Sequence, residues 1–322
     1  MAYNPQAPNM FVYGGNPNGN VAGNTGVANG APPDLCYDNS NGYIYVCTVS
    51  GNAASAVWVI KAATIGTAAL NVVQLDASAN MPNVSGIPGV AGSVRNAIMS
   101  VAAASATATF TADEIIVATA LNGVFLRLSS YSKSINLAIT GAGGMDTGSA
   151  PVSGYVSLYA IAKPDGTSSI LACNVTTSTA TIYAGANMPA GYTYSALIGT
   201  WPTNASSQFP IGYQTDRFVS IPLVAVLSAG TQTTYTSVSI SSAVPPNAKV
   251  AIGAAEANYV SAAAQVIIAA DVNGTGFTTV DGIPSQANHA FMQCPIVTSQ
   301  TLYYKTGNAG CTAYIFVTGY LF

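Results

Sequence analysis

The chain has 322 residues, only 6% of them are charged, and the formal net charge at pH 7 is −3. An average globular protein carries about 25% charged residues, whereas the polar side chains here are mainly Ser, Thr, Asn and Gln. No cluster of Lys or Arg occurs, which excludes the basic footprint of a nucleic-acid-binding protein and argues against an anionic membrane surface as partner.

The length allows two compact domains with a sizeable core. Val, Thr, Ala, Tyr and Gly are abundant while Glu, Lys and Leu are scarce, and this composition favours strands over helices. No apolar run reaches 18 residues, so we expect no membrane insertion. The opening residues, MAYNPQAPNMF, have neither the basic start nor the apolar run of a signal peptide, so we expect none.

Residues 1–33 contain no charge, and more than half of them are Asn, Gly or Pro. Such a segment cannot bury enough apolar surface to fold by itself. We predict an extended arm that is ordered only where a partner holds it. Its available apolar anchors are Tyr3, Met10, Phe11, Val12 and Tyr13, and we choose Tyr3, Phe11 and Tyr13 as the docking anchors. A tail without a partner is the alternative, and the sequence favours neither over the other.

Residues 34–60 predict a small β-hairpin module. The runs DLCY and YIYVC flank DNSNG, whose Asx and Gly residues tolerate positive φ and therefore suit a hairpin loop. With DNSNG as the loop, Cys36 faces Ile44, and strand alternation places Cys36 and Cys47 on opposite faces. We therefore expect neither a bond nor a shared metal between these two thiols. A third short strand ends on Trp58 and completes a mini-sheet that needs partners to be stable.

The chain has five cysteines, an odd number, and no CxxC spacing. Together with the expected lack of a signal peptide, this favours reduced, half-buried thiols and no structural disulfide. The five are Cys36, Cys47, Cys173, Cys294 and Cys311.

Residues 61–95 predict a connector rich in Pro and Gly, with one strand over NVVQLDAS. A central β-domain is predicted over residues 96–214. Its first segment, IMSVAAASATATFTADEIIVAT, alternates without a polar face, which suits strands buried on both sides or facing another subunit. Further strand-like runs recur every roughly 10 to 15 residues, the rhythm of a sandwich or barrel.

A second β-domain is predicted over residues 215–322. Its last run, CTAYIFVTGYLF, is apolar on both faces, which suggests that assembly covers one of them. A turn or two of helix is credible around residues 255–264. The residues predicted to form a subunit interface are Tyr314, Phe316, Tyr320 and Phe322.

The predicted fold class is therefore all-β. An extended N-terminal arm and a small hairpin module precede two antiparallel domains of β-sandwich or jelly-roll type. Apolar residues on both faces of several strands, together with scarce charge, predict a homo-oligomer. Three copies are the favoured number, in an intertwined trimer, which would also supply several arms that act together.

The sequence contains no convincing catalytic, cofactor or metal motif. The only histidine, His289, lies five residues before Cys294, and a Cys/His pair would need a positioned thiol. Asp113 and Glu114 are adjacent, so in a strand they point to opposite faces, which is wrong for the paired carboxylates of a glycosidase. GTGF and GAGG lack the residues that complete a nucleotide-binding motif. We expect no catalytic site, no cofactor and no metal.

Stretches in three parts of the chain resemble proteins of tailed bacteriophages. PPDLCYDNSNGYIYVCTVSGNAASAVW is similar to a short module near the N-terminus of many virion proteins. SVRNAIMSVAAASATATFTADEIIVATALNG, SINLAITGAGGMDTGSAPVSGYVSLYAIAKP and GANMPAGYTYSALIGTWPTNASSQF resemble a block of tail-fibre-type proteins. VPPNAKVAIG and the ending LYYKTGNAGCTAYIFVTGYLF resemble the terminal β-domain of such proteins. Together these stretches are spread from residue 32 to residue 322.

The resemblance implies a structural virion protein of the tail-fibre or head-fibre type, assembled in the bacterial cytoplasm. Its implied partners are further copies of itself, other virion proteins bound through the N-terminal arm, and a host cell-surface glycan or protein. Two alternatives stay open. One is a capsid decoration or cement protein that contacts no receptor, and the other is a tailspike-type polysaccharide depolymerase. The scarcity of acidic residues, 11 in the whole chain, argues against the depolymerase.

Overall fold

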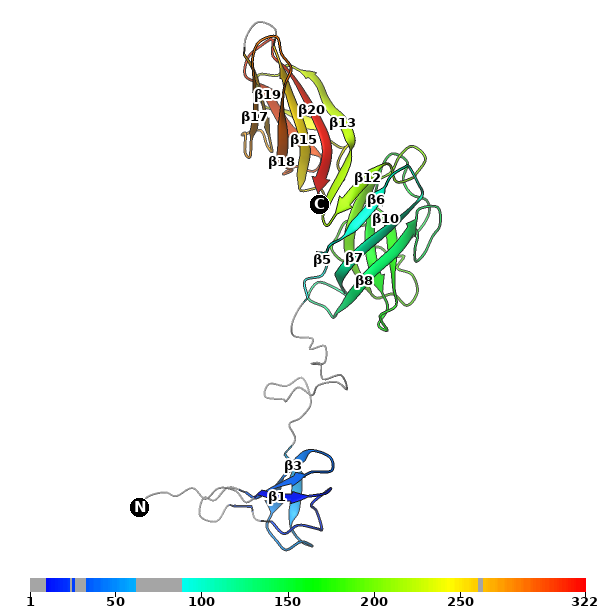
Figure 1. Cartoon of the computed structure of the whole chain (residues 1–322), viewed down its shortest axis with the longest axis vertical. Coiled ribbons are helices and arrows are strands. Elements are labelled where there is room, and N and C mark those ends of the chain that lie inside the picture. Colours follow the sequence, from blue (N-terminus) through cyan, green and yellow to red (C-terminus); the bar gives the residue numbers. More distant parts are fainter. Residues whose placement is uncertain (1–9, 24, 27–32, 62–88, 260–262) are drawn as a thin grey trace, which may run out of the picture. The chain divides into compact units, whose positions relative to one another are not determined.

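The computed structural model describes residues 10–23, 25–26, 33–61, 89–259 and 263–322. Strands are the only regular secondary structure in these residues, so the all-β prediction is confirmed. The chain divides into two compact units, Met1–Val84 and Ser85–Phe322, and each is described by itself. Figure 1 labels their strands. The strand predicted over NVVQLDAS lies outside the described residues.

The N-terminal unit is a four-stranded sheet in the order β1-β2-β3-β4. Its strands are β1 (Met10–Tyr13), β2 (Leu35–Asp38), β3 (Tyr43–Val49) and β4 (Val57–Ile60). The hairpin and the third strand expected from the sequence are β2, β3 and β4. The fourth strand, β1, comes from the segment predicted to be an extended arm, and it pairs parallel with β2.

The core of this unit lies on one face of the sheet. It contains Cys36, Tyr45, Cys47, Ala56 and Trp58, with Phe11, Tyr13 and Val21 packed against them. Phe11 meets the Trp58 ring edge to face, with 6.1 Å between the ring centroids. The segment that contains β1 is therefore ordered against the module that follows it in the same chain.

The register of the hairpin differs from the predicted one by one residue. Cys36 pairs with Tyr45, and Tyr37 pairs with Ile44. Because a one-residue shift moves a side chain to the other face, Cys36 and Cys47 lie on the same buried face. The prediction that they occupy opposite faces is wrong. Both thiols are nonetheless free, and the Cys47 thiol donates to the Val49 carbonyl.

The side chain of Asp38 holds the hairpin turn and the end of β1 together. Its Oδ1 accepts hydrogen bonds from the backbone N–H groups of Gly15, Ser40 and Asn41, and its Oδ2 accepts one from Asn41 Nδ2. The Asn41 amide, followed by the backbone donors, lowers the pKa of Asp38. An aspartate that accepts four hydrogen bonds shortens the turn by one residue relative to a loop over all of DNSNG.

The free edge of β4 is closed by a side chain. Asn18 Oδ1 accepts a hydrogen bond from the Trp58 backbone N–H at 2.7 Å, and Asn18 Nδ2 donates to the Trp58 carbonyl at 2.8 Å. One amide thus reproduces the two contacts that a neighbouring strand would make at this residue. Exposed strand edges invite pairing with other chains, so this contact protects part of the edge.

The second unit contains a 12-stranded sheet that runs through its whole length. In sheet order the main strands are β10 (Ser168–Asn174), β9 (Tyr155–Ala162), β11 (Tyr194–Pro202), β7 (Thr107–Ala118), β6 (Ile98–Val101), β12 (Gly212–Thr215), β13 (Phe218–Gly230), β20 (Thr312–Leu321), β15 (Val250–Asn258) and β18 (Asn288–Pro295). β5 (Val94–Arg95) and β8 (Phe125–Asn136) also pair with β7.

A second sheet of four strands packs against the far part of the first. Its order is β14 (Thr236–Ser239), β19 (Thr301–Thr306), β16 (Ala264–Ala269) and β17 (Thr278–Gly282). Ile315 and Ala255 of the large sheet share a buried core with Val266 and Leu302 of the small one. This C-terminal lobe is a β-sandwich. The short helix considered around residues 255–264 is absent from the described part of that range, where β15 and β16 lie instead.

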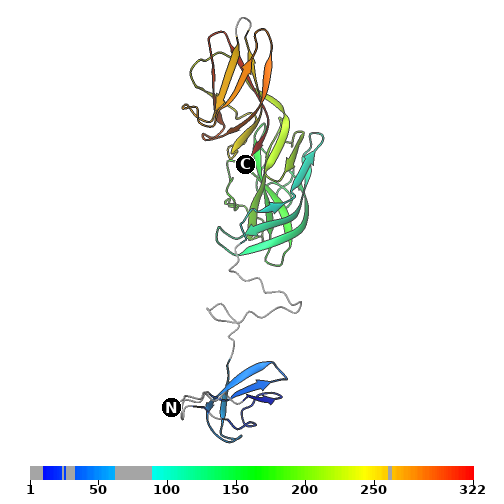
Figure 2. The same cartoon turned by 60° about the vertical axis from the view of Figure 1, so that its left-hand side comes forward.

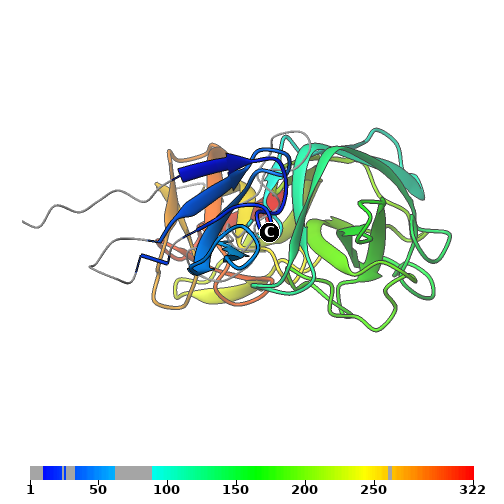
Figure 3. The ribbon, with the colours of Figure 1, turned by 90° about the horizontal axis from the view of Figure 1, so that it is seen from below.

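In the central lobe the strands curve around their own core (Figure 3). β9 is buried along its whole length, and β11 is buried except at its ends. Their second face packs on a smaller cluster that includes Tyr159, Leu171 and Tyr183. Burial on both sides was predicted for the segment that forms β6 and β7. That prediction is wrong for β6 and for the first half of β7, which alternate, and is correct only for Ile115–Ala118 at the end of β7.

The predicted domain boundary at residue 214 falls at the end of a strand that belongs to both lobes. β12 pairs with β6 on one side and with β13 on the other. β13 then continues into the C-terminal lobe and pairs with β20, as Figures 1 and 2 show. The two predicted β-domains are thus joined by one continuous ladder. Val94–Arg95, expected to end the connector, already belongs to this sheet.

A buried amide network fixes β12 against β11. Gln214 is fully buried. Its Oε1 accepts from the Trp201 indole N–H at 2.7 Å, and its Nε2 donates to the carbonyls of Ile198 and Asp216, both at 2.7 Å. A buried amide with all these partners restricts the local register, because any slip leaves polar groups without partners.

Replacing Gln214 with Leu should destabilise the second unit by on the order of 3 kcal/mol, since the indole N–H and two carbonyls lose their buried partner. Chemical denaturation of the full chain, followed by Trp201 fluorescence, measures the change. The control is Gln286→Leu, at an exposed glutamine. Equal stability of the two variants would contradict the role assigned to the network.

The stability of the N-terminal unit should fall in acid because of Asp38. Its folded-state pKa is below the unfolded value near 3.9, so its contribution is complete above about pH 5 and is lost as pH falls through the folded pKa. In residues 1–84, Trp58 is the only tryptophan, and its fluorescence during thermal unfolding at a series of pH values checks this. The Asp38→Asn variant should have a lower thermal midpoint than the parent at pH 7, and its midpoint should fall less as the pH is lowered. A midpoint for the parent unit that stays constant down to pH 3 would refute the assignment.

Candidate functional site

The outer face of the N-terminal sheet is apolar, and the described residues of this unit leave it uncovered. Along the paired strands, Val12, Tyr37 and Ile44 form one row, and Met10, Leu35, Val46 and Val59 form the next. Val49 and Val57 pair beyond them. We call this surface the N-terminal apolar face. Its members are Met10, Val12, Leu35, Tyr37, Ile44, Val46, Val49, Val57 and Val59.

None of these nine side chains is charged, and several are widely exposed. Met10 and Val12 each expose 64% of their surface, and Val59 exposes 49%. Single exposed apolar residues are ordinary, but a contiguous group on one sheet face indicates a binding surface. Lys61 stands at its margin, where its backbone N–H extends the ladder to Ile44. The chemistry available here is apolar packing with a flat, uncharged partner.

The predicted docking anchors do not lie on this face. Phe11 and Tyr13 point inward and pack on the core of their own unit, so the prediction that they are anchors for a partner is wrong. Tyr3 lies outside the described residues. The outward residues of the same strand, Met10 and Val12, are the ones that a partner can reach. The alternation in MFVY shows that Phe11 and Tyr13 share one face and that Met10 and Val12 share the other. The sequence predicted no neighbouring strand for this segment, so it did not show which of the two faces points inward.

The part of the C-terminal lobe that the structure describes also leaves one sheet face uncovered, on the outside of β13, β20, β15 and β18. One row across the four strands is Ala225, Phe316, Ala254 and Phe291. The next row contains Tyr314, Glu256 and His289. The alternate residues of these strands, among them Ile315 and Ala255, point into the sandwich core. We call this surface the C-terminal aromatic face.

Tyr314 and Phe316 form a ridge on this face. Their rings are nearly parallel, with an interplanar angle of 9° and 6.5 Å between centroids. That separation is close to the spacing of alternate residues along a strand, so the two rings stand side by side and point the same way. Both side chains are only partly buried. Both rings lie on the outer side of the sheet, and the interface role predicted for them stays a prediction.

The other two predicted interface residues lie elsewhere. Tyr320 is fully buried and donates a hydrogen bond to the Thr200 carbonyl, so its predicted role in a subunit interface is wrong. Phe322 is partly buried, with the Arg217 guanidinium 5.1 Å from its ring centroid. Contrary to the prediction, Tyr320 does not share the face of Phe316, because β20 has a bulge at Thr318. On either side of the bulge, Gly319 pairs with Ile252 and Val317 pairs with Gly253. The extra residue reverses the alternation for the end of the strand.

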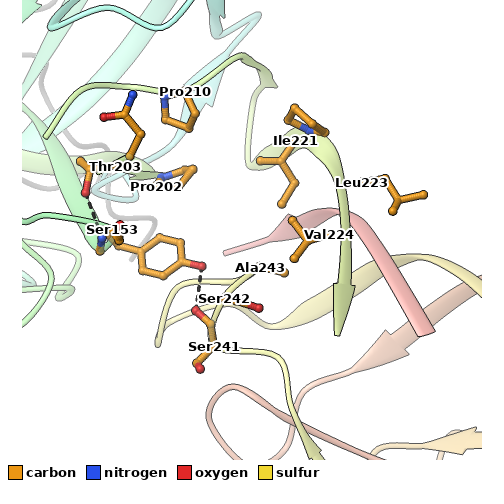
Figure 4. Close-up of a pocket in the computed structure, with 14 residues that line it drawn as sticks. Ser153, Pro202, Thr203, Pro210, Ile221, Leu223, Val224, Ser241, Ser242 and Ala243 are labelled. Atoms are coloured by element: carbon orange, nitrogen blue, oxygen red, sulfur yellow. Dashed lines mark hydrogen bonds between the residues drawn. The ribbon is translucent and has the colours of Figure 1, made fainter. Parts of the chain in front are cut away.

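A pocket of about 390 Å³ lies between the central and C-terminal lobes of the second unit (Figure 4). It is bounded by the start of β9, the end of β11, the 241–243 turn and the part of β13 where its pairing with β20 is interrupted. Tyr155 crosses it and donates to the Ser241 carbonyl at 3.0 Å. Its lining contains Pro202, Pro210, Pro222, Ile221 and Val224 together with hydroxyl groups.

The pocket has the size of a small-ligand site and a neutral lining. No lining residue is Asp, Glu, His, Lys, Arg or Cys. Thr203, one of its hydroxyl groups, is already committed, since it donates to the Pro151 carbonyl and accepts from the Gly154 N–H. This cavity could hold a neutral molecule.

The ionisable groups considered in the sequence do not form a reactive pair. His289 is exposed, with its Nδ1 3.6 Å from a carboxylate oxygen of Glu256. Cys294 is buried on the opposite face of β18, and burial raises its pKa to about 11. Asp113 accepts from Asn96, whereas Glu114 lies 3.8 Å from Arg127. These are surface contacts, and exposed ion pairs of this kind add little stability.

Within the described residues, no group of three or more His, Cys, Asp or Glu side chains could hold a metal ion. All five cysteines are buried and free. In the same part of the chain, the search for a helix with the length and hydropathy of a membrane span finds none.

No protein-family model and no curated protein matches this chain.

Proposed function

We propose that this protein is a structural component of a tailed-bacteriophage particle, a fibre or spike that attaches through its N-terminal unit and projects its second unit. In this proposal it acts by binding and catalyses no reaction. It assembles in the bacterial cytoplasm, becomes part of the virion and contributes to contact with a host cell-surface glycan or protein.

The observation that carries the proposal is the N-terminal apolar face. Nine uncharged apolar residues on a small separate sheet are a costly surface to leave in water, since each buried CH₂ group is worth about 0.8 kcal/mol. A compact unit with its own core, joined to a larger unit, suits a docking module. The sequence resemblance of residues 32–58 to a module of phage virion proteins supports the same conclusion.

The second unit supports self-association. Its C-terminal aromatic face is uncovered and contains two of the predicted interface residues, Tyr314 and Phe316. We propose a homo-oligomer, with three copies as the number favoured from the sequence. Several copies held together would present several N-terminal apolar faces to the particle, which strengthens weak docking by raising the effective concentration.

A capsid cement protein is the alternative that differs only in its partners. It would use the same two faces but contact no receptor. Imaging of particles locates the protein on the head, collar or tail and separates a cement role from a projecting fibre. A depolymerase has less support, because the pocket contains no carboxylate.

Charging the N-terminal apolar face should remove the protein from assembled particles. In the variant with Val12→Lys and Ile44→Lys, two lysines lie in one row of the face, beside Tyr37. Burying unpaired ammonium groups against an apolar partner is unfavourable, so we expect at least about a tenfold lower copy number per particle. Quantitative mass spectrometry of purified particles measures it. Normal incorporation of this variant would rule out the face as the docking surface.

The matched control is Ala54→Lys, which adds a charge in an exposed turn of the same unit. Both variants should keep the thermal midpoint and the oligomeric state of the parent. Deleting residues 1–33 is a less selective test, because it also removes β1 and the Asn18 contact on β4. Loss of incorporation on that deletion alone would therefore report on folding as well as docking.

A further inference from the structure

The C-terminal aromatic face has an order of large and small residues that makes it complementary to itself. Across the strands β13, β20, β15 and β18, the row reads Ala225, Phe316, Ala254, Phe291. Small and large side chains therefore alternate at the strand spacing of about 4.8 Å. Phe291 is 66% exposed, and Phe316 is half of the ridge described above.

We infer that this face binds the same face of a second copy of the chain. The symmetry is a two-fold axis that runs parallel to the strands and passes between β20 and β15, midway between the two sheets. Such a rotation exchanges positions on either side of the axis. Phe316 of one copy then lies over Ala254 of the other, and Phe291 lies over Ala225. Each large side chain meets a small one, as in the layered packing of a β-sandwich.

The neighbouring row is complementary in its polar groups. The same axis places Tyr314 of one copy over Glu256 of the other, where the phenol O–H can donate to the carboxylate. Within one chain Glu256 already accepts from Asn258 Nδ2 and lies 3.6 Å from His289 Nδ1. A carboxylate with this set of partners can be covered without being left unsatisfied, which is the condition for burying a charge.

The area of the C-terminal aromatic face limits the affinity expected between two copies. Four strands about 4.8 Å apart, each contributing roughly 20 Å of length, give roughly 400 Å² per copy. A standard interface buries about 800 Å² per partner. The contact is therefore smaller than that of a permanent dimer, and we expect association in the micromolar range. It deepens the proposed self-association by naming the surface and its symmetry, and it favours pairs of copies over the three-fold arrangement.

The test measures the mass of the full chain by light scattering and sedimentation over about 1 to 100 µM, a range that spans such an affinity. The parent should pass from one copy to two as concentration rises. Ala254→Phe fills the small position and Phe316→Ala lowers the ridge, so each should weaken pairing by at least about tenfold. The double variant with both changes exchanges large for small across the axis and should recover most of the association.

Leu121→Phe, at an exposed position of the central lobe, is the matched control and should pair like the parent. Equal thermal midpoints show that the variants are folded, and if Ala254→Phe fails to fold, Phe316→Ala carries the test. A parent that stays monomeric, or single variants that associate unchanged, would overturn the inference. A trimer unaffected by these variants would also overturn it while leaving the proposed homo-oligomer in place. Loss of the protein from particles in the N-terminal variants is a separate result and does not depend on this contact.

Discussion

The ladder through β12 and β13 is the constraint on which the second unit depends. β12 is only four residues long, yet it pairs with β6 on one side and β13 on the other. Gln214, at its centre, is held by Trp201 and two carbonyls. Because β12 connects the two lobes, its register determines where β13 enters the sandwich. The position of β13 in turn determines the position of the outer face of β20 and β15.

Scarce charge shapes how the chain satisfies its polar groups. At two places that join strands, this protein uses amides and not ion pairs: Asn18 closes an edge of the N-terminal sheet, and Gln214 joins two strands. Asp38 is an ion held by hydrogen bonds from N–H donors alone. Neutral groups carry little long-range repulsion, so uncharged sheet faces can approach other surfaces closely. The same low charge allows the N-terminal apolar face and the C-terminal aromatic face to pack against other uncharged surfaces.

Sequence reasoning identified the all-β class and most strands, because alternation and turn residues are local signals. It failed where one residue decides the outcome. The four hydrogen bonds to Asp38 tighten the turn and shift the hairpin register, which reverses the face of Cys36. The bulge at Thr318 reverses that of Tyr320. The partner of β1 lies over 20 residues further along the chain, so the inward packing of Phe11 depends on a non-local pairing that no local pattern specifies.

The buried thiols give each core its own chemical reporter. Cys36 and Cys47 lie in the N-terminal core, Cys173 lies in the smaller cluster of the central lobe, and Cys294 lies in the large core. Burial raises the pKa of Cys173 to about 12, so only roughly one thiol in 10⁵ is ionised at neutral pH, and the thiolate is the species that alkylating reagents attack. Labelling must therefore wait for the surrounding core to open. The order in which the cysteines are alkylated would rank the local opening free energies along the chain without any added probe.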